Sequence, residues 1–439
     1  MTDALAYENV KNSGIEWIGD IPKDWNIRTI YQLVTQVKCK NSDLRETNLL
    51  SLSYGKIKRK DIDSPEGLLP ASFGGYNIIE AGDIVLRLTD LQNDHTSLRV
   101  GLSTERGIIT SAYTTLRPLN IKQSKYIYYL LHAFDLKKGF YGMGSGVRQG
   151  LNYDGVKELR VVIPNDTEMD GIVVFLDDQC GQIDNLIEEA KAGIEEYKAW
   201  KASIIYETVT KGLDPTVEMK DSGVPWISEI PSDWKIVPLK SEFSFGKGLP
   251  ITKADLTSEG IPVISYGQIH SKVNPGTRIV EELLRYVPEK YLESNPSSLA
   301  KRGDIFLADT SEDLGGIGNA AYIDTDNTIF AGYHTIIARP EHPENSKYLS
   351  YLFLADNWRR QLRMMASGIK VFSVTQAMLR KTSILLPTPA EQGQICDFLD
   401  DKCSLIDGVI AEKQAMISDL ESYKKSLIYE AVTGKRKVV

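Results

Sequence analysis

Few residues in this 439-residue sequence have the types and spacing that catalysis would need. The adjacent acids Asp177 and Asp178, with their copies Asp400 and Asp401, are the best candidates for acid–base or metal chemistry. Adjacent residues of a helix point in different directions, and the helix dipole stabilises acids in the early turns. A structural role for these acids is therefore favoured over a catalytic one.

Cofactor and metal motifs are also missing from the sequence. It has no Asn-Pro-Pro-Tyr-like tetrapeptide for amino-methyl transfer and no Gly-x-x-x-x-Gly-Lys-[Ser/Thr] phosphate loop. The glycine-rich segment Gly142–Gly146 lacks the strand-then-helix context of a dinucleotide site. Four cysteines without a Cys-x-x-Cys pair and five scattered histidines offer neither a zinc site nor a disulfide framework. The sequence thus predicts no catalytic, cofactor-binding or metal-ligating residue.

Basic and polar side chains suited to nucleic-acid contact are more numerous. A basic run beside Tyr54 suits phosphate contact, although a solvated charged strand explains it equally well. Arg87 and the polar tract that follows offer fork donors and amides that can read purine edges in the major groove. The candidates in the first half of the chain are Lys56, Lys58, Arg59, Lys60, Arg87, Gln92, Asn93, Ser145, Arg148 and Gln149.

The loop around Arg148 is the strongest of these candidates. Ser145-Gly-Val-Arg148 has a counterpart in Ser367-Gly-Ile-Lys370, which keeps Ser-Gly and a base and then diverges. This pattern is expected if a common frame places the loop while its tip reads sequence. The candidates in the second half are Lys247, Tyr266, Gln268, His270, Lys272, His334, Ser367 and Lys370.

Composition and charge exclude several classes of protein. With 42% hydrophobic and 25% charged residues, the sequence is neither collagen-like nor disordered. No apolar stretch approaches the length of a membrane span, and the N-terminus lacks the layout of a signal peptide, so we expect a cytoplasmic protein. Residues 165–200 hold ten acids and two lysines, an excess equal to the net charge of −8. Any nucleic-acid contact must therefore use local basic patches away from this segment.

The chain is an internal repeat. Residues 13–25 recur as 222–234, residues 175–184 as 398–407, and residues 203–210 as 426–433. Between these matched ends the two copies agree only in outline, so two similar frames enclose two different interiors. The tryptophans Trp17, Trp25, Trp226 and Trp234 recur at the same places, which favours framework packing over base stacking.

The spacing of apolar residues and the positions of turn-forming residues predict a mixed α/β fold in each copy. Short β-rich runs predict strands over 83–89, 158–163, 304–309 and 382–386, and helical spacing predicts helices over 125–138 and 347–363. Long helices are predicted over 172–209 and 395–432. The expected boundaries are 1–165 and 213–387 for the globular domains, and 166–212 and 388–439 for the helical regions.

The two long helices carry heptads in the same register. The seam positions are Cys180, Ile183, Ile187, Ala190, Ile194, Tyr197, Lys201 and Ile204, and Cys403, Ile406, Ile410, Lys413, Ile417, Leu420, Lys424 and Leu427. Each seam is expected to pair with the other in an antiparallel coiled coil, although docking on its own globular domain is an alternative. Two similar domains related by a pseudo-twofold match the half-site symmetry of DNA. Different interiors then predict an asymmetric, bipartite target.

The repeated frame resembles a known family. Trp-Ile-Gly-Asp-Ile-Pro-x-x-Trp near the start, Gly-Asp-Ile at a strand, and a Phe-Leu-Asp-Asp helix ending in Tyr-Glu-x-Val-Thr resemble the DNA-specificity subunit of type I restriction–modification systems. The likeness covers essentially the whole chain. It implies that each globular domain is a target-recognition domain for one half of a split DNA sequence. It also implies that the helices set the unread spacer and dock methyltransferase subunits.

The resemblance further implies a non-catalytic subunit without a cofactor of its own. S-adenosylmethionine, ATP and magnesium then belong to partner subunits, which are two methyltransferase subunits and the restriction/translocase subunits. Two alternatives stay open at this point. One is a tandem-repeat scaffold that binds protein or glycan, and the other is an enzyme with an unrecognised site.

Overall fold

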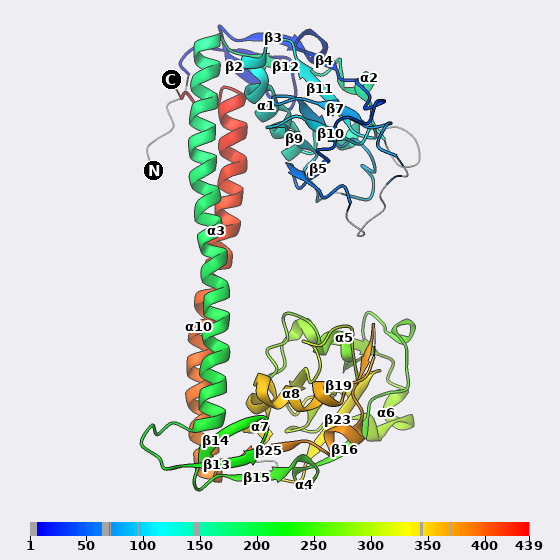
Figure 1. Ribbon diagram of the computed structural model, residues 1–439, viewed down its shortest axis with the longest axis vertical. Helices are drawn as coiled ribbons and strands as arrows, with labels where there is room; N and C mark the ends of the chain where they lie inside the picture. Colours follow the sequence, from blue (N-terminus) through cyan, green and yellow to red (C-terminus); the bar gives the residue numbers. More distant parts are fainter. Residues whose placement is uncertain are drawn as a thin grey trace. The chain divides into compact units, whose positions relative to one another are not determined.

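The computed structural model describes residues 7–63, 70, 72–94, 96–143, 150–342, 346–368 and 370–438. The chain divides into two compact units (Figure 1). The first unit contains residues 1–191 and 414–439, and the second contains residues 192–413. Each unit therefore consists of one globular part and portions of both long helices.

The globular part of the first unit has twelve short strands and two helices among its described residues. They are β1 (Val10–Asn12), β2 (Asp20–Pro22), β3 (Asn26–Thr29), β4 (Val34–Gln36), β5 (Leu50–Ser53), β6 (Lys56–Arg59), β7 (Asn77–Ile79), β8 (Ile84–Leu86), β9 (Val100–Leu102), β10 (Gly107–Ile109), β11 (Thr114–Pro118), α1 (Ser124–Leu136), α2 (Tyr153–Val156) and β12 (Arg160–Ile163).

The globular part of the second unit follows the same plan with more short elements. They are β13 (Met219–Val224), β14 (Ile227–Pro231), β15 (Lys235–Pro238), α4 (Leu239–Glu242), β16 (Phe243–Lys247), β17 (Ile261–Ile264), α5 (Tyr266–Ile269), β18 (Arg285–Val287), α6 (Tyr291–Ser294), β19 (Ile305–Ala308), β20 (Thr310–Ser311), β21 (Ala320–Tyr322), β22 (Phe330–Ala331), β23 (Thr335–Pro340), α7 (Ser346–Leu354), α8 (Asp356–Met365), β24 (Phe372–Ser373), α9 (Gln376–Leu379) and β25 (Ser383–Leu386).

A four-stranded antiparallel sheet is central to each unit, in the order β4-β11-β8-β9 in the first and β16-β23-β19-β21 in the second. An ion pair lies at the same place in both sheets. Arg117 Nη2 is 2.6 Å from the buried Asp83 carboxylate, and Arg339 Nη2 is 2.7 Å from the buried Asp304 carboxylate. The side-chain hydrogen bonds from each guanidinium hold its pKa above its usual value.

The predicted mixed fold is confirmed, but several element boundaries differ from the sequence expectation. Both long helices begin six residues earlier than expected, at Asp166 and at Pro389. The strand expected over 83–89 ends at Leu86, and the single helix expected over 347–363 is two helices, α7 and α8. Ala355 interrupts them in an extended conformation, with ψ of 131°. Across this break, the rings of Phe353 and Trp358 stack at 4.0 Å between centroids. Burial of this aromatic pair compensates for the backbone hydrogen bonds that a continuous helix would have made.

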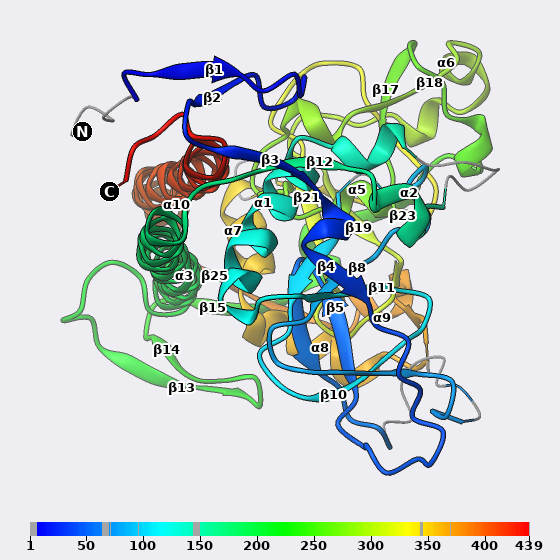
Figure 2. The same cartoon turned by 90° about the horizontal axis from the view of Figure 1, so that it is seen from above.

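The long helices are α3 (Asp166–Lys211) and α10 (Pro389–Val432), and each contributes residues to both units. In the second unit, Gly193 of α3 lies beside Lys413 of α10, while Lys201 pairs with Asp407 at 2.7 Å. Residue numbers thus rise along one helix as they fall along the other, so the pairing is antiparallel. Figure 2 shows the two helices side by side.

The predicted heptad seam lies on the least exposed face of both helices, where each of its positions is buried or half-buried. In the first unit, Cys180, Ile183 and Ile187 are buried, and Lys424 of α10 pairs with Asp184 at 2.6 Å. This ion pair is the repeat of Lys201 with Asp407, because both partners shift by the 223-residue repeat. The helices also dock on their own globular parts, since Ile172 and Leu176 share a hydrophobic core with Tyr126 and Leu130. Both packing arrangements considered from the sequence are therefore present.

Hydrogen bonds join each globular part to the helices at equivalent places. Trp25 Nε1 donates to Glu168 Oε2 at 2.9 Å, and Trp234 Nε1 donates to Glu391 Oε2 at 3.0 Å. Both of these indoles are fully buried, which confirms their predicted framework role. Within the described ranges, none of the helices is long and apolar enough to cross a membrane.

Candidate nucleic-acid interface

Polar side chains gather at one edge of the central sheet in the second unit. β19 and β23 are paired there through Ala308 and Thr335, and Lys247 is the last residue of the neighbouring strand β16. Asp309 and His334, which lie next to the paired residues, therefore occupy the same edge. We call this edge, with the connection 309–319, the loop edge of the second unit.

One further segment joins this loop edge through backbone contacts. Thr310 of β20 pairs with Ser373 of β24, and Val374 N donates to Asp309 O at 2.7 Å. These bonds bring the segment that contains Ser367 and Lys370, both exposed, to the loop edge. The structure therefore places these two residues in a segment that is held to the strand-end loops.

His334 has an unusual backbone at this edge. Its φ of 55° lies in the left-handed region, which a side chain seldom adopts without support. His334 Nδ1 lies 3.1 Å from Asp309 Oδ1, and its ring packs edge-to-face with Tyr266 at 5.3 Å. The imidazole is 57% exposed, so it is held on one side and open on the other. Such a held, exposed side chain is suited to contacting a ligand.

The remaining candidates of the second unit differ in their surroundings. Gln268 accepts from Ser265 N at 3.2 Å as part of a capping box at the start of α5. His270 Nε2 lies 2.8 Å from Thr310 O, and both ring nitrogens have partners within the unit. Lys272 is exposed and lines a different cavity, of about 460 Å³, together with Arg278 and Lys198. The structure therefore gives Gln268 and His270 supporting contacts within the unit, whereas Lys272 lies beside a separate cavity.

A cavity of about 410 Å³ lies at the loop edge of the second unit, between α5 and the connection 309–319. Its lining includes Tyr266, His270, Glu312, Asp313 and Asn319. The sequence analysis did not single out Asn319. Nothing in its local pattern marks it, because its partners come from distant parts of the chain.

The first unit has an equivalent loop edge, defined by the connection 87–99. β8 and β11 are paired through Leu86 and Thr114, as β19 and β23 are in the second unit. Arg87 follows directly, with a side chain one-third exposed and Nη2 3.6 Å from Asp94. Asn93 is exposed and donates to Asp90 Oδ1 at 2.8 Å. Gln92 beside it is also exposed.

A fully buried arginine supports this connection from inside. The Arg99 guanidinium donates to Arg87 O at 3.1 Å, to Thr89 O at 2.8 Å and to Asp90 O at 3.3 Å. Because one guanidinium donates to three carbonyl oxygens of the connection, it fixes the path of the chain there. Arg99 was not predicted from the sequence, which gives no sign of a buried arginine.

The predicted loop residues Ser145, Arg148 and Gln149 lie outside the described residues. The nearby Leu151 N donates to Leu88 O at 2.9 Å, just as Val374 N donates to Asp309 O in the second unit. Leu151, which follows these residues in the sequence, is therefore anchored at the loop edge of the first unit.

The basic run of the first unit lies on a hairpin beside the same edge. Tyr54 and Gly55, with φ of 49° and 75°, form the turn between β5 and β6. A Cβ on Gly55 would lie 3.0 Å from Leu98, so the turn packs against the end of connection 87–99. Lys56, Lys58 and Lys60 are exposed. The hairpin thus adds three lysines to the loop edge.

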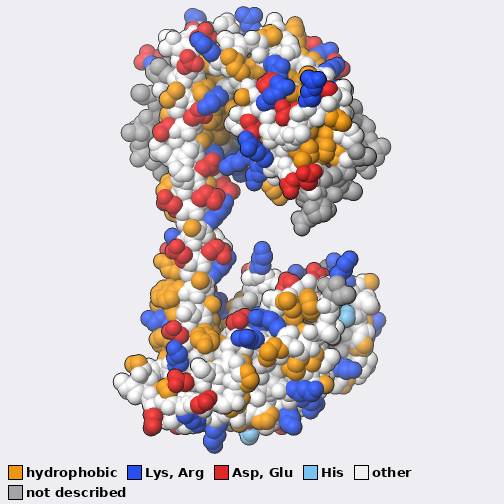
Figure 3. Space-filling model, viewed as in Figure 1, with side chains coloured by type: hydrophobic (Ala, Val, Ile, Leu, Met, Phe, Trp, Pro, Cys, Tyr) orange, Lys and Arg blue, Asp and Glu red, His pale blue; other side chains and the backbone are white. Residues whose placement is uncertain are grey.

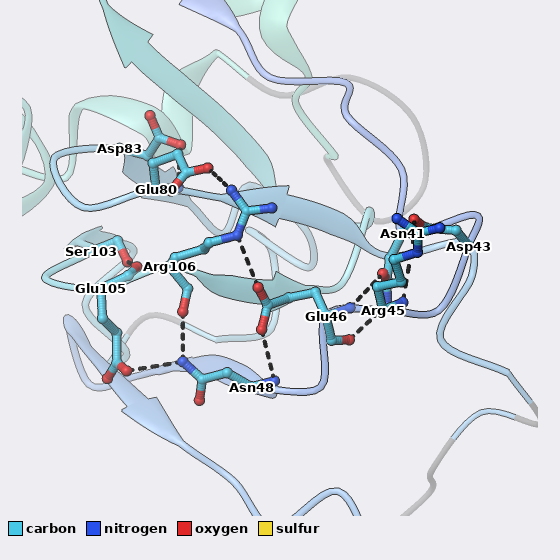
Figure 4. A network of polar contacts seen from close by, with 10 residues as sticks. All are labelled: Asn41, Asp43, Arg45, Glu46, Asn48, Glu80, Asp83, Ser103, Glu105 and Arg106. Atoms are coloured by element: carbon cyan, nitrogen blue, oxygen red, sulfur yellow. Dashed lines mark hydrogen bonds and ion pairs between the residues drawn. The ribbon is translucent and has the colours of Figure 1, made fainter.

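Arg59 differs from these lysines because an acid neutralises it. Its Nε donates to Glu105 Oε2 at 2.7 Å, and this bond lowers the pKa of Glu105. Figure 4 shows the network that holds Glu105: Asn48 Nδ2 donates to Glu105 Oε2 at 2.9 Å and to Arg106 O at 2.6 Å. Arg106 in turn pairs with Glu46 at 2.9 Å. Arg59 is therefore committed to the unit, whereas the lysines remain available to a ligand.

Tyr54 is a candidate that the sequence analysis mentioned only as a neighbour of the basic run. It is 76% exposed at the tip of the hairpin. An exposed aromatic ring beside lysines suits a surface that contacts a polyanion with flat bases. The signal was the Tyr-Gly pair between two alternating runs, which is typical of a tight hairpin turn.

Charged side chains of both signs are spread over the surface. Figure 3 shows acidic and basic side chains along the helices and on the globular parts. Among the described residues, no group of three or more His, Cys, Asp or Glu is arranged to hold a metal ion.

One repeated frame with two chemically different loop edges defines a class of protein that carries two recognition surfaces on one chain. Residues 231–415 match the family described as the Type I restriction modification DNA specificity domain. The type I restriction enzyme MjaVIII specificity subunit of Methanocaldococcus jannaschii is 24% identical over 425 residues, which cover 95% of this chain and 94% of that protein. The putative MjaX specificity subunit of the same organism is 24% identical over 455 residues, or 98% and 97% of the two chains.

A solved structure described as the structural basis of complex assembly and conformational transition of the type I R-M system has the same fold. It matches with a TM-score of 0.67 at 13% identity, over 94% of this chain and 98% of that chain. The second half of the chain thus contains a type I restriction modification DNA specificity domain, and nearly the whole chain is similar to type I restriction enzyme specificity subunits.

Proposed function

We propose that the chain reads DNA for a type I restriction–modification complex, with each loop edge contacting one half of a bipartite, asymmetric target. The observation that carries this proposal is the contrast between frame and edge. Tyr129 donates to Asp177 at 2.8 Å and Tyr351 donates to Asp400 at 2.5 Å, one of several contacts that repeat between the units. The loop edges, at equivalent ends of the sheets, carry different side chains. A constant frame with a variable edge is what two different half-sites require.

The two loop edges would read DNA with different groups. In the first unit, the Arg87 fork and the Asn93 amide suit purine edges, while Lys56, Lys58 and Lys60 suit phosphates. In the second unit, the exposed candidates at the edge include His334, Lys370 and Lys247, the last residue of the neighbouring strand. The family match disfavours the alternative of a protein- or glycan-binding scaffold.

The helices would set the unread spacer and dock two methyltransferase subunits. Exposed aromatic residues occur at equivalent positions of the two helices, with Trp200 of α3 54% exposed and Tyr423 of α10 47% exposed. Leu186 and Leu405 are also exposed on the helices. Exposed aromatic and aliphatic side chains are the usual anchors of protein interfaces. We assign one methyltransferase subunit to each aromatic residue.

On this proposal the chain contributes no catalytic residue. S-adenosylmethionine, ATP and magnesium would be bound by the methyltransferase and restriction/translocase partners, and the chain would supply only the choice of site. This division of labour gives the proposal a direct biochemical test.

The test mixes the chain with its cognate methyltransferase subunit and maps DNA methylation. Specific methylation is expected from the mixture and from neither component alone. Arg87→Ala is expected to reduce discrimination at one base pair, by about 1–3 kcal/mol if the contact is bidentate. Lys58→Ala is expected to weaken binding to all sequences and to flatten the salt dependence. Specific methylation by the chain alone would contradict the proposal.

A further inference from the structure

A line of polar groups connects helix α8 with the loop edge of the second unit. Arg359 of α8 donates from Nη1 to Asn319 Oδ1 at 2.6 Å and from Nε to Phe353 O at 2.8 Å. Asn319 Nδ2 lies 3.0 Å from His270 Nδ1, and His270 Nε2 lies 2.8 Å from Thr310 O. Three side chains thus link the helix break to β20.

The chemistry of each group fixes the direction of every bond in this line. A guanidinium only donates, so Asn319 must present its oxygen to Arg359 and its NH2 to His270. Nδ1 of His270 is then an acceptor, and the single imidazole proton is on Nε2, where it donates to Thr310 O. Burial lowers the pKa of Arg359 to about 10, so the guanidinium still carries its charge at neutral pH. One arginine therefore determines the amide orientation and the histidine tautomer.

Two glycines allow the connection 309–319 to follow this line closely. Gly318 has φ of +84°, and a Cβ there would lie 3.2 Å from Arg359 Cγ. A Cβ on Gly316 would lie 2.5 Å from Ser311 Oγ and 3.1 Å from the His270 ring. The connection is therefore closely packed on the histidine that the arginine orients.

Thr310, where the line ends, is the residue on which the loop edge depends. It pairs with Ser373, and its neighbour Asp309 contacts both His334 and Val374. A shift of Thr310 would move the two segments that carry His334 and Lys370. The line thus supports the exposed candidates without itself being exposed at the edge.

We propose that Arg359, acting through Asn319 and His270, is the positioning residue for the DNA-contacting loop edge of the second unit. This inference rests on the proposed function. Arg99 supports the first loop edge from inside, but it lies next to β9 rather than on a helix. The two units therefore use arginines from different elements for the same purpose, because each variable interior must support its own loops.

The experiment uses the full chain in complex with its methyltransferase subunit. Arg359→Met is expected to lower affinity for the cognate target about ten-fold, the equivalent of one lost base contact. The loss should vanish on DNA that keeps the first half-site and scrambles the second. Arg360→Met, at the adjacent exposed position, is the matched control and should bind as the unaltered chain does. Asn319→Leu should match Arg359→Met, and the two together should cost no more than either alone.

Asn319→Asp distinguishes a positioning role from general damage to the fold. Its carboxylate can accept from Arg359 and from a proton on His270 Nδ1, while Nε2 still donates to Thr310. Binding is therefore expected to be retained, and the nitrogen chemical shifts of His270 should change from the Nε2–H tautomer to the doubly protonated ring. If Arg359→Met unfolds the unit, this comparison of Asn319→Leu with Asn319→Asp still decides the matter.

Equal second half-site discrimination in Asn319→Leu and the unaltered chain would overturn the positioning role and leave the proposed function intact. The absence of any bipartite preference in the unaltered complex would instead overturn the proposed function. The two failures are thus separate results of one set of measurements.

Discussion

Two buried titratable residues on α1 stabilise the first unit in different pH ranges. His132 and Asp135 lie one helical turn apart, and both side chains are buried. Burial raises the pKa of Asp135 from 3.8 to about 6. Burial, with a smaller effect of Lys424, lowers the pKa of His132 from 6.5 to about 4. Asp135 also accepts from Arg99 N at 2.6 Å, so this pair bears on the first loop edge.

The signs of the two effects are opposite. The folded unit favours protonated Asp135. Its contribution to the unfolding free energy is therefore full below pH 3.8 and is lost as the pH rises through about 6. The folded unit favours neutral His132. Its contribution to the unfolding free energy is therefore present above pH 6.5 and is lost as the pH falls through about 4. At about 1.4 kcal/mol for each tenfold change, each contribution amounts to about 3 kcal/mol. Between pH 4 and 6.5 the two changes nearly cancel.

Single variants separate these contributions. We expect the unfolding free energy of the unaltered chain minus that of Asp135→Asn to rise by about 3 kcal/mol from pH 7 to pH 4. The same difference for His132→Gln should fall by about 3 kcal/mol over this range. Denaturant unfolding at several pH values measures both, and the double variant is the control, with a nearly flat difference. Difference curves with the same slope for both single variants would refute the reasoning.

Three other predictions concern the helices and the frame. Inserting four residues after Gly193 and four after Met416 keeps the heptad nearly in phase, so a methylation map should show a longer unread gap between unchanged half-sites; an unchanged gap would show that the helices do not set the spacer. Lys201→Asp and Asp407→Lys should each lower the unfolding free energy by about 1 kcal/mol, and the double variant should recover most of this loss. A double-mutant cycle that shows no coupling between the two residues would contradict the pairing. Trp234→Phe should destabilise the second unit by about 1 kcal/mol in denaturant unfolding, because the half-buried Glu391 loses its donor; no change would contradict that hydrogen bond's role.

The frame could be predicted from the sequence because its signals are periodic and repeated. The spacing of Ile183 and its neighbours indicated the helix seam, and the copy in the second helix identified its partner. The recurrence of Trp25 as Trp234 indicated that these residues pack in the frame rather than contact a ligand. Both conclusions depend on comparing one part of the chain with another, which a single sequence allows.

The supports of the loop edges could not be predicted in this way. Arg99 and Arg359 have partners that are distant in sequence or are backbone carbonyls, and neither leaves a pattern of residue types. The break at Ala355 escaped detection because helical spacing continues across it. The candidate Lys370 was predicted in a loop and Arg87 near the end of a strand, and their contacts with DNA remain predictions.

The measurement that tests the central claim most directly is a genome-wide methylation map after an exchange of interiors. Residues 26–163 are replaced by the corresponding interior of a similar specificity subunit, and the frame is kept. If each unit reads its own half-site, one half of the recognised sequence changes while the other half and the spacer stay the same. Changes in both halves, or in neither, would contradict independent reading by the two units.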